Sequence, residues 1–462
     1  MADAWTWMSL EELIHAYRQR ALSPVEVVEG QLDRIEQVNP RVNAVYHVDR
    51  EAALAAAALS DRRWRDGAPA GPLDGVPMTI KDALATKGLP GYRGSAAEPE
   101  RVADHDHPTV ARVREAGAVI LGKNAMCDYG ILASSVSSRH GTTCNPRNLS
   151  RTAGASSSGA AASVAAGIEP VAIGTDIVGS IRVPASWCGL AGLKPSQGRV
   201  PYWFQPSPAL VAGPLARHVR DAALLLNVLA QPDGRDFTAL PPSGEDYHAD
   251  LEAFEPSGLR IVVVPDLGTG PAPDRAVLHA LDRVEALLAG AGAEVERLSP
   301  PFEAADLDPV ERHYLVRCLA ELSKRPEEEA RLSPAIWDWT RAGEAMSAVE
   351  LYDGLNAMQR LRERAVRLVD GAEFLILPST PVTAFAAGTL APDGVRPFSL
   401  WGNTCLFNLT EQPAASLPFG TDPDGLPVGI QIVGHRFDDA GVLRLARYLE
   451  RHAPPLAPPD LD

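Results

Sequence analysis

The chain is 462 residues long, and 45% of them are hydrophobic against 22% charged, a composition that can bury a large core. Lysine and arginine total 43 against 59 acidic residues, so the formal net charge is −16. This charge opposes direct binding to nucleic acid or to an anionic membrane surface, and we expect neither as a partner.

The N-terminal stretch and the cysteines indicate a cytoplasmic protein. Residues 1–20 carry charge throughout, and no long uncharged apolar run follows, so we expect neither a signal peptide nor a membrane-spanning helix. The five cysteines stand singly, without a CxxC pair. This spacing favours reduced thiols over a disulfide framework or a zinc site.

Two helix starts are marked near the N-terminus. Ser9 precedes Glu12 by three residues, and Ser23 precedes Pro24 and Glu26 in the same way. A hydroxyl cap three residues before a carboxylate is typical of a capping box, and proline is favoured at the first helical position. The sequence therefore predicts two helices here, which we interpret as scaffold.

From residue 75 onward, short apolar runs alternate with alanine-rich helical stretches, a pattern that indicates an α/β layered domain with a substantial sheet. A segment rich in glutamate, arginine and aromatic residues, typical of helices, fills about 300–370, and strand-like runs resume after it. Because strands lie on both sides of this variable helical segment, we expect a single domain over 1–462. Its core would comprise 70–230 and 370–455.

Three segments combine small residues with a reactive side chain: VPMTIKD (76–82), TAGASSSGAAASVAAG (152–167) and GTDIVGSIRVPASWCG (174–189). Separately they are ambiguous. Lys81 at a strand end could extend its amine to solvent, and a Ser/Gly/Ala run often only leads into a helix. The GTDIVGS turn could direct successive backbone N–H groups at an oxyanion or a phosphate.

Together, the three segments resemble the amidase signature family in order and in spacing. The family has a lysine in a KD strand end, a Gly/Ser-rich segment and a GTDxGGSIRxPA segment, which match Lys81-Asp82, residues 154–159 and residues 174–185 here. Ser180 lies 24 residues after Ser156 and 99 after Lys81, as the family pattern requires, and Ser157 is one residue off. Further matching segments occur at 117–123, 141–146, 375–381, 411–420 and 425–434.

The resemblance implies a fold and a mechanism. The fold would be an α/β/α sandwich with a large central mixed β-sheet surrounded by helices. Lys81, held neutral by burial, would take a proton from Ser156, which in turn takes that of Ser180 as Ser180 attacks an amide carbonyl. The peptide bond between Ala155 and Ser156 would be cis. No metal and no cofactor are expected.

The resemblance also assigns supporting groups around this triad. The oxyanion would be met by backbone N–H groups of Ile177, Val178, Gly179 and Ser180. Asp176, Arg182 and Ser157 would support these groups from behind, although a plain structural ion pair between Asp176 and Arg182 is an equal alternative.

Three positions depart from the family pattern: Ala155, Ser158 and Val178 stand where the family commonly has glycine. A β-branched valine resists positive φ, so the oxyanion turn would be distorted if position 178 required it. Backbone N–H donors survive a change of side chain, and we therefore expect activity to be kept.

Other interpretations of single motifs are weaker. GAVILGKN (117–124) resembles a P-loop, but its apolar interior favours a buried strand. The DHDH run at 104–107 has metal-ligand residue types but precedes a helix in an expected surface loop. His140 lies near the Gly/Ser segment and would be the base of a Ser-His-Asp hydrolase, although no G-x-S-x-G elbow is present.

The favoured function is an amidase that cleaves a small carboxylic amide through an acyl-enzyme on Ser180. The alternatives are the glutaminase subunit of a tRNA-dependent amidotransferase and a non-catalytic member of the fold. The natural amide is open, an ester or ureido substrate could react by the same steps, and a homodimer is possible. Candidates for the acyl pocket are Tyr314, Arg317, Trp337 and Trp339, although buried packing is the favoured role for each of them.

Overall fold

A mixed sheet of eleven strands forms the centre of the protein in the computed structural model, which describes residues 5–203 and 209–461. The strands, in spatial order, are β1 (Val45–Val48), β5 (Val119–Asn124), β2 (Pro77–Lys81), β10 (Val171–Asp176), β12 (Val211–Ala216), β11 (Ala191–Lys194), β16 (Ala414–Thr421), β17 (Pro427–Gly434), β15 (Phe374–Pro378), β13 (Arg260–Val263) and β14 (Glu294–Arg297). Strand β2 runs parallel to β5 and β10, and β13 runs parallel to β15 and β14, whereas the other pairs are antiparallel. The sheet is therefore mixed, as predicted.

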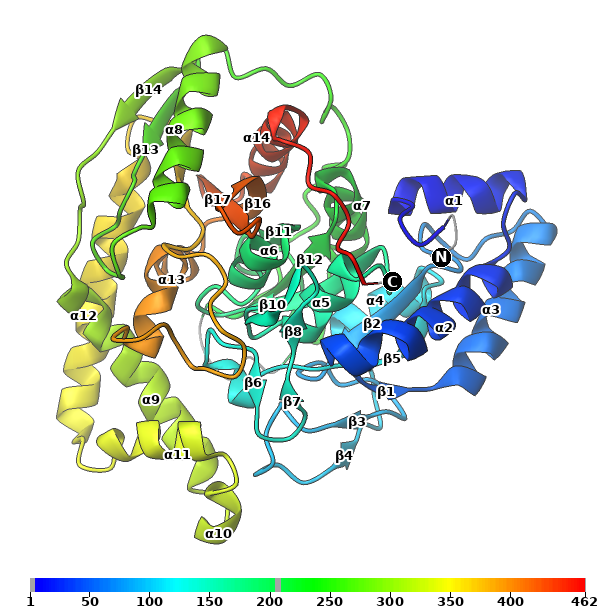
Figure 1. The fold of residues 1–462 in the computed structure, drawn as a ribbon, viewed down its shortest axis with the longest axis horizontal. Coiled ribbons are helices and arrows are strands. Elements are labelled where there is room, and N and C mark those ends of the chain that lie inside the picture. Colours follow the sequence, from blue (N-terminus) through cyan, green and yellow to red (C-terminus); the bar gives the residue numbers. More distant parts are fainter. Residues whose placement is uncertain (1–4, 204–208, 462) are drawn as a thin grey trace.

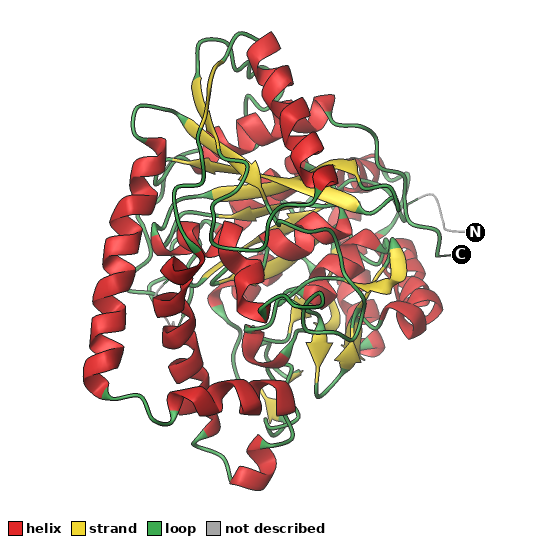
Figure 2. Cartoon of the chain, turned by 60° about the vertical axis from the view of Figure 1, so that its left-hand side comes forward, coloured by secondary structure: helices red, strands yellow, loops and turns green. Residues whose placement is uncertain are grey.

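Helices pack on both faces of this sheet (Figure 2). They are α1 (Leu10–Gln19), α2 (Pro24–Val42), α3 (Arg50–Arg65), α4 (Pro108–Glu115), α5 (Ser158–Ala165), α6 (Arg182–Cys188), α7 (Val219–Leu229), α8 (Arg275–Gly290), α9 (Asp308–Leu322), α10 (Glu327–Ala330), α11 (Pro334–Thr340), α12 (Ala348–Val366), α13 (Gly402–Leu409) and α14 (Asp439–His452). In the described part of the chain, three two-stranded ribbons accompany the sheet: β3 (Pro90–Gly91) with β4 (Arg101–Val102), β6 (Val136–Ser137) with β7 (Gly141–Thr142), and β8 (Cys144–Asn145) with β9 (Asn148–Thr152).

Strand β5 shows why the sheet needs helices on both faces. Successive side chains of a strand point to opposite faces, so a strand with consecutive apolar residues must be covered on both faces. Val119 and Leu121 join a buried core with α2, α3, α5 and α6, whereas Ile120 between them joins the core shared with α4, α7 and α14. This arrangement confirms the predicted sandwich and the strand interpretation of the P-loop-like segment.

The two predicted N-terminal helices begin as expected. Ser9 caps α1 and Ser23 caps α2, and in each case the glutamate three residues later bonds back to the cap, which completes a capping box. Among the described residues, no helix is both long enough and apolar enough to cross a lipid bilayer.

The segment predicted to be helical between about 300 and 370 forms α9, α10, α11 and α12. These helices lie together at the side of the molecule away from α1, α2 and α3 (Figure 1). Strands β13 and β15, from before and after this segment, pair with each other in the central sheet. The helices α9 to α12 are therefore an insertion between strands of the same sheet.

Candidate active site

The ends of two parallel neighbouring strands create the site. Strand β2 ends at Lys81, and β10 beside it ends at Asp176, with Ile80 paired to Ile173. Because parallel strands end at the same edge of a sheet, the side chains that close them converge there. The turn that leads into α5 supplies the third group, Ser156.

Lys81 lies at the centre of this convergence. Its Nζ is 3.0 Å from Ser156 Oγ, 2.8 Å from Ser157 Oγ and 2.7 Å from Thr175 Oγ1, and the side chain is fully buried. Burial lowers the pKa of Lys81 from its ordinary value to about 7, and the nearby carboxylates of Asp176 and Asp82 offset only part of that effect. A large fraction of this amine is therefore uncharged near neutral pH and able to accept a proton.

Ser156 and Ser157 have different surroundings. The peptide bond between Ala155 and Ser156 is cis, as expected. Ser157 Oγ lies 3.2 Å from both the N and the O of Thr175, and the Ser157 N–H donates to the Ser180 carbonyl at 3.3 Å. Ser157 thus ties the two serine-bearing segments and β10 together, which is a supporting position.

Ser180 faces a cavity of about 970 Å³ that Ser156, Thr175 and Ile177 also line. Its hydroxyl is buried and has no hydrogen-bond partner among the described residues. A buried hydroxyl without a partner is costly, and its position in a cavity leaves it available to a group that enters from outside. The structure therefore brings Lys81 and Ser156 into direct contact and places Ser180 beside the same cavity.

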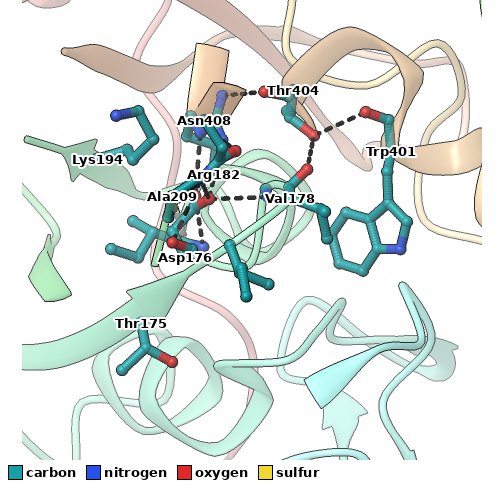
Figure 3. A network of polar contacts seen from close by, with 12 residues as sticks. Thr175, Asp176, Val178, Arg182, Lys194, Ala209, Trp401, Thr404 and Asn408 are labelled. Carbon is teal, nitrogen blue, oxygen red and sulfur yellow. Dashed lines mark hydrogen bonds and ion pairs between the residues drawn. The ribbon is translucent and has the colours of Figure 1, made fainter. Parts of the chain in front are cut away.

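An ion pair fixes the turn that carries Ser180 (Figure 3). Arg182 donates to both carboxylate oxygens of Asp176, at 3.0 and 2.9 Å, and both side chains are fully buried. Asn408 from α13 donates to the same carboxylate at 2.8 Å. Burial acts to raise the pKa of Asp176, but Arg182 and Asn408 outweigh it and hold the pKa at about 2. The carboxylate therefore stays charged and anchors the turn.

A family model described as Amidase matches residues 26–443. The chain belongs to the amidase signature family. It is similar to a Glutamyl-tRNA(Gln) amidotransferase subunit of Acidothermus cellulolyticus, with 35% identity over 95% of this chain and 93% of that one. It is also similar to an acylamidase of Rhodococcus erythropolis, with 30% identity over 97% of this chain and 96% of that one. A bacterial aryl acylamidase of the family superposes with a TM-score of 0.92 at 30% identity, covering 98% of both chains.

The glycine replacements do not distort the turn. None of Val178, Ala155 and Ser158 has a positive φ. In the turn that carries Ser180, the residue with a positive φ of 139° is Gly179. A Cβ at position 179 would lie 2.2 Å from Thr404 Oγ1, so this position requires glycine for space as well as for conformation. The Thr404 hydroxyl also donates to the Val178 carbonyl at 2.5 Å and supports the turn from α13.

The structure differs from the expected oxyanion hole at one donor. The N–H of Gly179 donates to Asp176 Oδ1 at 2.8 Å, so it is engaged in holding the turn and is directed away from an oxyanion. The backbone N–H groups of Ile177, Val178 and Ser180 make no hydrogen bond to any described residue, and Ile177 and Ser180 line the cavity. The sequence could not show which of the four N–H groups face the cavity, because they differ only in the direction in which each N–H bond points.

The four acyl-pocket candidates divide into two groups. Arg317 lines the cavity, and Tyr314, one turn earlier on α9, donates to the Ile177 carbonyl at 3.3 Å. The two tryptophans do not line this cavity. Trp339 donates to Glu311 at 3.1 Å, and Trp337 lines a separate pocket between α9 and α11. Both tryptophans are partly buried against the hydrophobic core, which agrees with the packing role that the sequence favoured for them.

The weaker motifs have structural roles. His140 stacks on Tyr46 with ring centroids 4.1 Å apart, and it does not line the cavity that contains Ser180. In the DHDH run, Asp106 pairs with Arg114, while His107 caps α4. Asp106 and His107 therefore serve helix α4, whereas Asp104, His105 and His107 also line the cavity that contains Ser180.

Sequence reasoning missed two contributors beside Lys81. Thr175 Oγ1 accepts from the Lys81 amine, and its place next to Asp176 in the GTD motif was a usable signal. Lys123 on β5 is buried and donates to the Lys81 carbonyl at 3.2 Å. Its place beside Lys81 emerges only from the pairing of β2 with β5, in which Lys123 stands opposite Ile80.

Proposed function

We propose that the protein is an amidase that hydrolyses a small carboxylic amide to a carboxylate and ammonia or an amine, through an acyl-enzyme on Ser180. The observation that carries the proposal is the 3.0 Å contact between Lys81 Nζ and Ser156 Oγ, beside the cavity in which the Ser180 hydroxyl has no partner. An amide carbonyl is a poor electrophile, so an attacking hydroxyl needs a base within hydrogen-bond reach. Lys81, with a pKa of about 7, is suited to that role.

In the acylation step, neutral Lys81 accepts the proton of Ser156 while Ser156 accepts the proton of Ser180. Ser180 Oγ then bonds to the carbonyl carbon, and the carbonyl oxygen becomes an oxyanion. Catalytic hydrogen bonds often tighten only in the substrate complex, and we expect the contact between Ser156 and Ser180 to form at that stage. The N–H groups of Ile177, Val178 and Ser180 stabilise the oxyanion, each by about 3 kcal/mol.

Collapse of the tetrahedral intermediate breaks the carbon–nitrogen bond. Ser156 returns a proton to the departing nitrogen and recovers one from Lys81. Water then attacks the acyl-enzyme with the same proton transfers, which releases the carboxylic acid and restores Ser180. The water supplies the hydroxyl of the acid, and the amine leaves with the proton, so atoms and protons balance.

A second candidate is the glutaminase subunit of a tRNA-dependent amidotransferase. The 35% identity to a subunit of such an amidotransferase over nearly the whole length favours it. The TM-score of 0.92 with an aryl acylamidase favours the free-standing amidase. The two differ in one testable respect, because a glutaminase subunit delivers ammonia to partner subunits and would require them for full turnover.

The deciding experiment measures amine or ammonia release by the purified chain alone, across aliphatic, aryl, amino-acid and ureido amides, with glutamine included. We expect release from simple amides and none from the Ser180→Ala variant. Ser163 is a matched control, because it is another buried serine without a hydrogen-bond partner among the described residues and it lies outside the cavity lining. Ser163→Ala should keep its activity.

Two outcomes would redirect the proposal. Glutamine as the sole substrate, with turnover that rises on addition of amidotransferase partner subunits, would establish the second candidate. Failure of a fluorophosphonate probe to label Ser180, together with no release from any amide, would show a non-catalytic member of the family.

A further inference from the structure

The cavity beside Ser180 is locally cationic in an acidic protein. The chain as a whole carries a formal charge of −16. The lining nevertheless contains six cationic side chains, which are Arg93, Arg101, Lys123, Arg317, Lys324 and Arg325. Its acidic side chains are only Asp82, Asp104 and Glu321 among the described residues. A cleft with an excess of one sign of charge attracts ligands of the opposite sign, even when the rest of the surface repels them.

Most of these cations already have acidic partners within the protein. Two glutamates serve four of them, through the pairs Arg93–Glu321 (3.4 Å), Lys324–Glu321 (3.4 Å), Arg325–Glu98 (2.6 Å) and Arg101–Glu98 (3.5 Å). Lys123 is saturated by backbone and hydroxyl oxygens, and burial lowers its pKa to about 8. These five groups therefore hold the loops and α9 together.

Arg317 differs from the other cations. Its Nη2 donates to the Tyr129 carbonyl at 3.2 Å, and its buried Nε has no hydrogen-bond partner among the described residues. No carboxylate in the described part of the chain pairs with it. A guanidinium remains charged at any physiological pH, and a partly buried charge without a counter-ion is costly. The missing partner can come from a molecule that enters the cavity.

The position of Arg317 is close to the reacting groups. Tyr129, whose carbonyl it contacts, is followed by Gly130, where an added Cβ would lie only 3.2 Å from Ser156 Oγ. Tyr314 stands three residues before Arg317 on α9 and donates to the Ile177 carbonyl in the oxyanion turn. Residues three apart share one face of a helix. One face of α9 therefore contacts both the oxyanion turn and the loop that lies against Ser156.

From these contacts we propose that the substrate is an amide that also bears a carboxylate, and that Arg317 pairs with this carboxylate while Ser180 attacks the amide carbonyl. The inference rests on the proposed amidase function and specifies its substrate class. The planar guanidinium presents a fork of N–H donors that matches a carboxylate in two parallel hydrogen bonds. The pair would fix the orientation of the amide and supply the counter-ion that Arg317 lacks.

The kinetic test compares kcat/KM for monoamides of linear dicarboxylic acids with that for uncharged amides of similar length. The wild type should prefer the anionic amide, and Arg317→Met should reduce this preference about ten- to a hundredfold, since a hydrogen bond between charged groups is lost. Arg317→Lys keeps the positive charge but lacks the fork of N–H donors. Its preference for the anionic amide should lie between that of the wild type and that of Arg317→Met. Arg312→Met is the matched control, because Arg312 lies on the same helix, is exposed and is absent from the cavity lining.

A second pair of substrates locates the carboxylate. N-acyl amino acids carry it on the leaving amine, whereas dicarboxylic monoamides carry it on the acyl part. The substrate class whose kcat/KM falls more in Arg317→Met identifies the side of the scissile bond that faces α9. Equal rates for anionic and neutral amides in the wild type, or a preference unchanged in Arg317→Met, would overturn the inference.

Binding separates this inference from the amidase proposal. Calorimetric titration of the Ser180→Ala protein with each dicarboxylic monoamide needs no turnover. The same titration is done with the double variant that carries both Ser180→Ala and Arg317→Met. If the double variant binds the monoamide at least about tenfold more weakly than Ser180→Ala does, carboxylate recognition is supported even if the wild type proves inactive. Hydrolysis of neutral amides together with no binding of anionic ones supports the amidase and refutes the role of Arg317.

Discussion

Lowering the pH below neutrality should inactivate the protein by protonating a single amine. The amine is Lys81, whose pKa burial lowers to about 7, and only its uncharged form can accept the proton of Ser156. Below this pKa the ammonium predominates and the base is lost, whereas above it the base is fully available. We therefore expect kcat/KM to rise with pH through neutrality and then to level off.

The size of the effect follows from the pKa. With a value of about 7, roughly 90% of Lys81 is neutral at pH 8, about 9% at pH 6 and about 1% at pH 5. Activity should therefore fall about tenfold from pH 8 to pH 6 and about tenfold again to pH 5. A lysine with an ordinary pKa near 10.4 would instead give a rate that still rises about tenfold per pH unit at pH 9.

The assay measures initial rates with a chromogenic anilide far below KM, at constant ionic strength, between pH 5 and pH 10. Enzyme returned from each pH to pH 8 should recover full activity, which excludes irreversible unfolding as the cause. Lys194→Met provides a control, because burial also lowers the pKa of Lys194 to about 7 while its amine lies outside the cavity lining. The profile of this variant should match that of the wild type.

Two results would refute the reasoning. One is a kcat/KM that continues to rise through pH 9, since Lys81 would then have an ordinary pKa. The other is a Lys81→Met variant that keeps more than about a tenth of the wild-type activity, because loss of a general base costs about 10²- to 10⁴-fold. Either would require another base for Ser180.

Three substitutions near the turn test its construction. Arg182→Met leaves Asp176 buried without its ion-pair partner and should lower the free energy of unfolding in urea by about 3–5 kcal/mol. Gly179→Ala should lower both Tm and kcat, since its Cβ meets Thr404, whereas Gly354→Ala on α12 meets nothing within 4 Å and should raise stability by about 0.5–1 kcal/mol. Thr404→Val removes a hydrogen bond to the turn and should cost about 1 kcal/mol with a lower kcat. Unchanged unfolding curves for Arg182→Met, or equal Tm for the two glycine variants, would contradict this account of the turn.

The sequence predicted the groups that are defined by local motifs and spacing. Lys81 at the end of an apolar strand, Ser156 in the Gly/Ser segment and Ser180 in the GTD segment are predicted in this way, and their catalytic roles stay predictions. The cis bond before Ser156 also agrees with the expectation. The strands and the α/β class followed from hydrophobic patterning, which reports what each segment must bury. The α/β/α sandwich with its mixed sheet followed from the resemblance to the family.

Long-range placement could not be predicted in the same way. The order of the eleven strands depends on pairing between distant segments, such as β10 with β12 and β13 with β15. Asn408 bonds Asp176 across 232 residues, and no local pattern marks it. The direction of Trp337 and Trp339 depends on how α11 packs, and the N–H of Gly179 differs from its neighbours only in orientation.

The buried Arg182 beside Ser180 has a consequence for synthesis of the chain. Arg182 Nη1 donates to Gln431 Oε1 at 2.7 Å, and Asn408 completes the same cluster, so the turn at Ser180 is braced by residues translated up to 249 positions later. A growing polypeptide on the ribosome therefore lacks these braces until β17 has emerged. The proposed active site would therefore be assembled only at the close of translation, and we expect a C-terminally truncated product to remain inert.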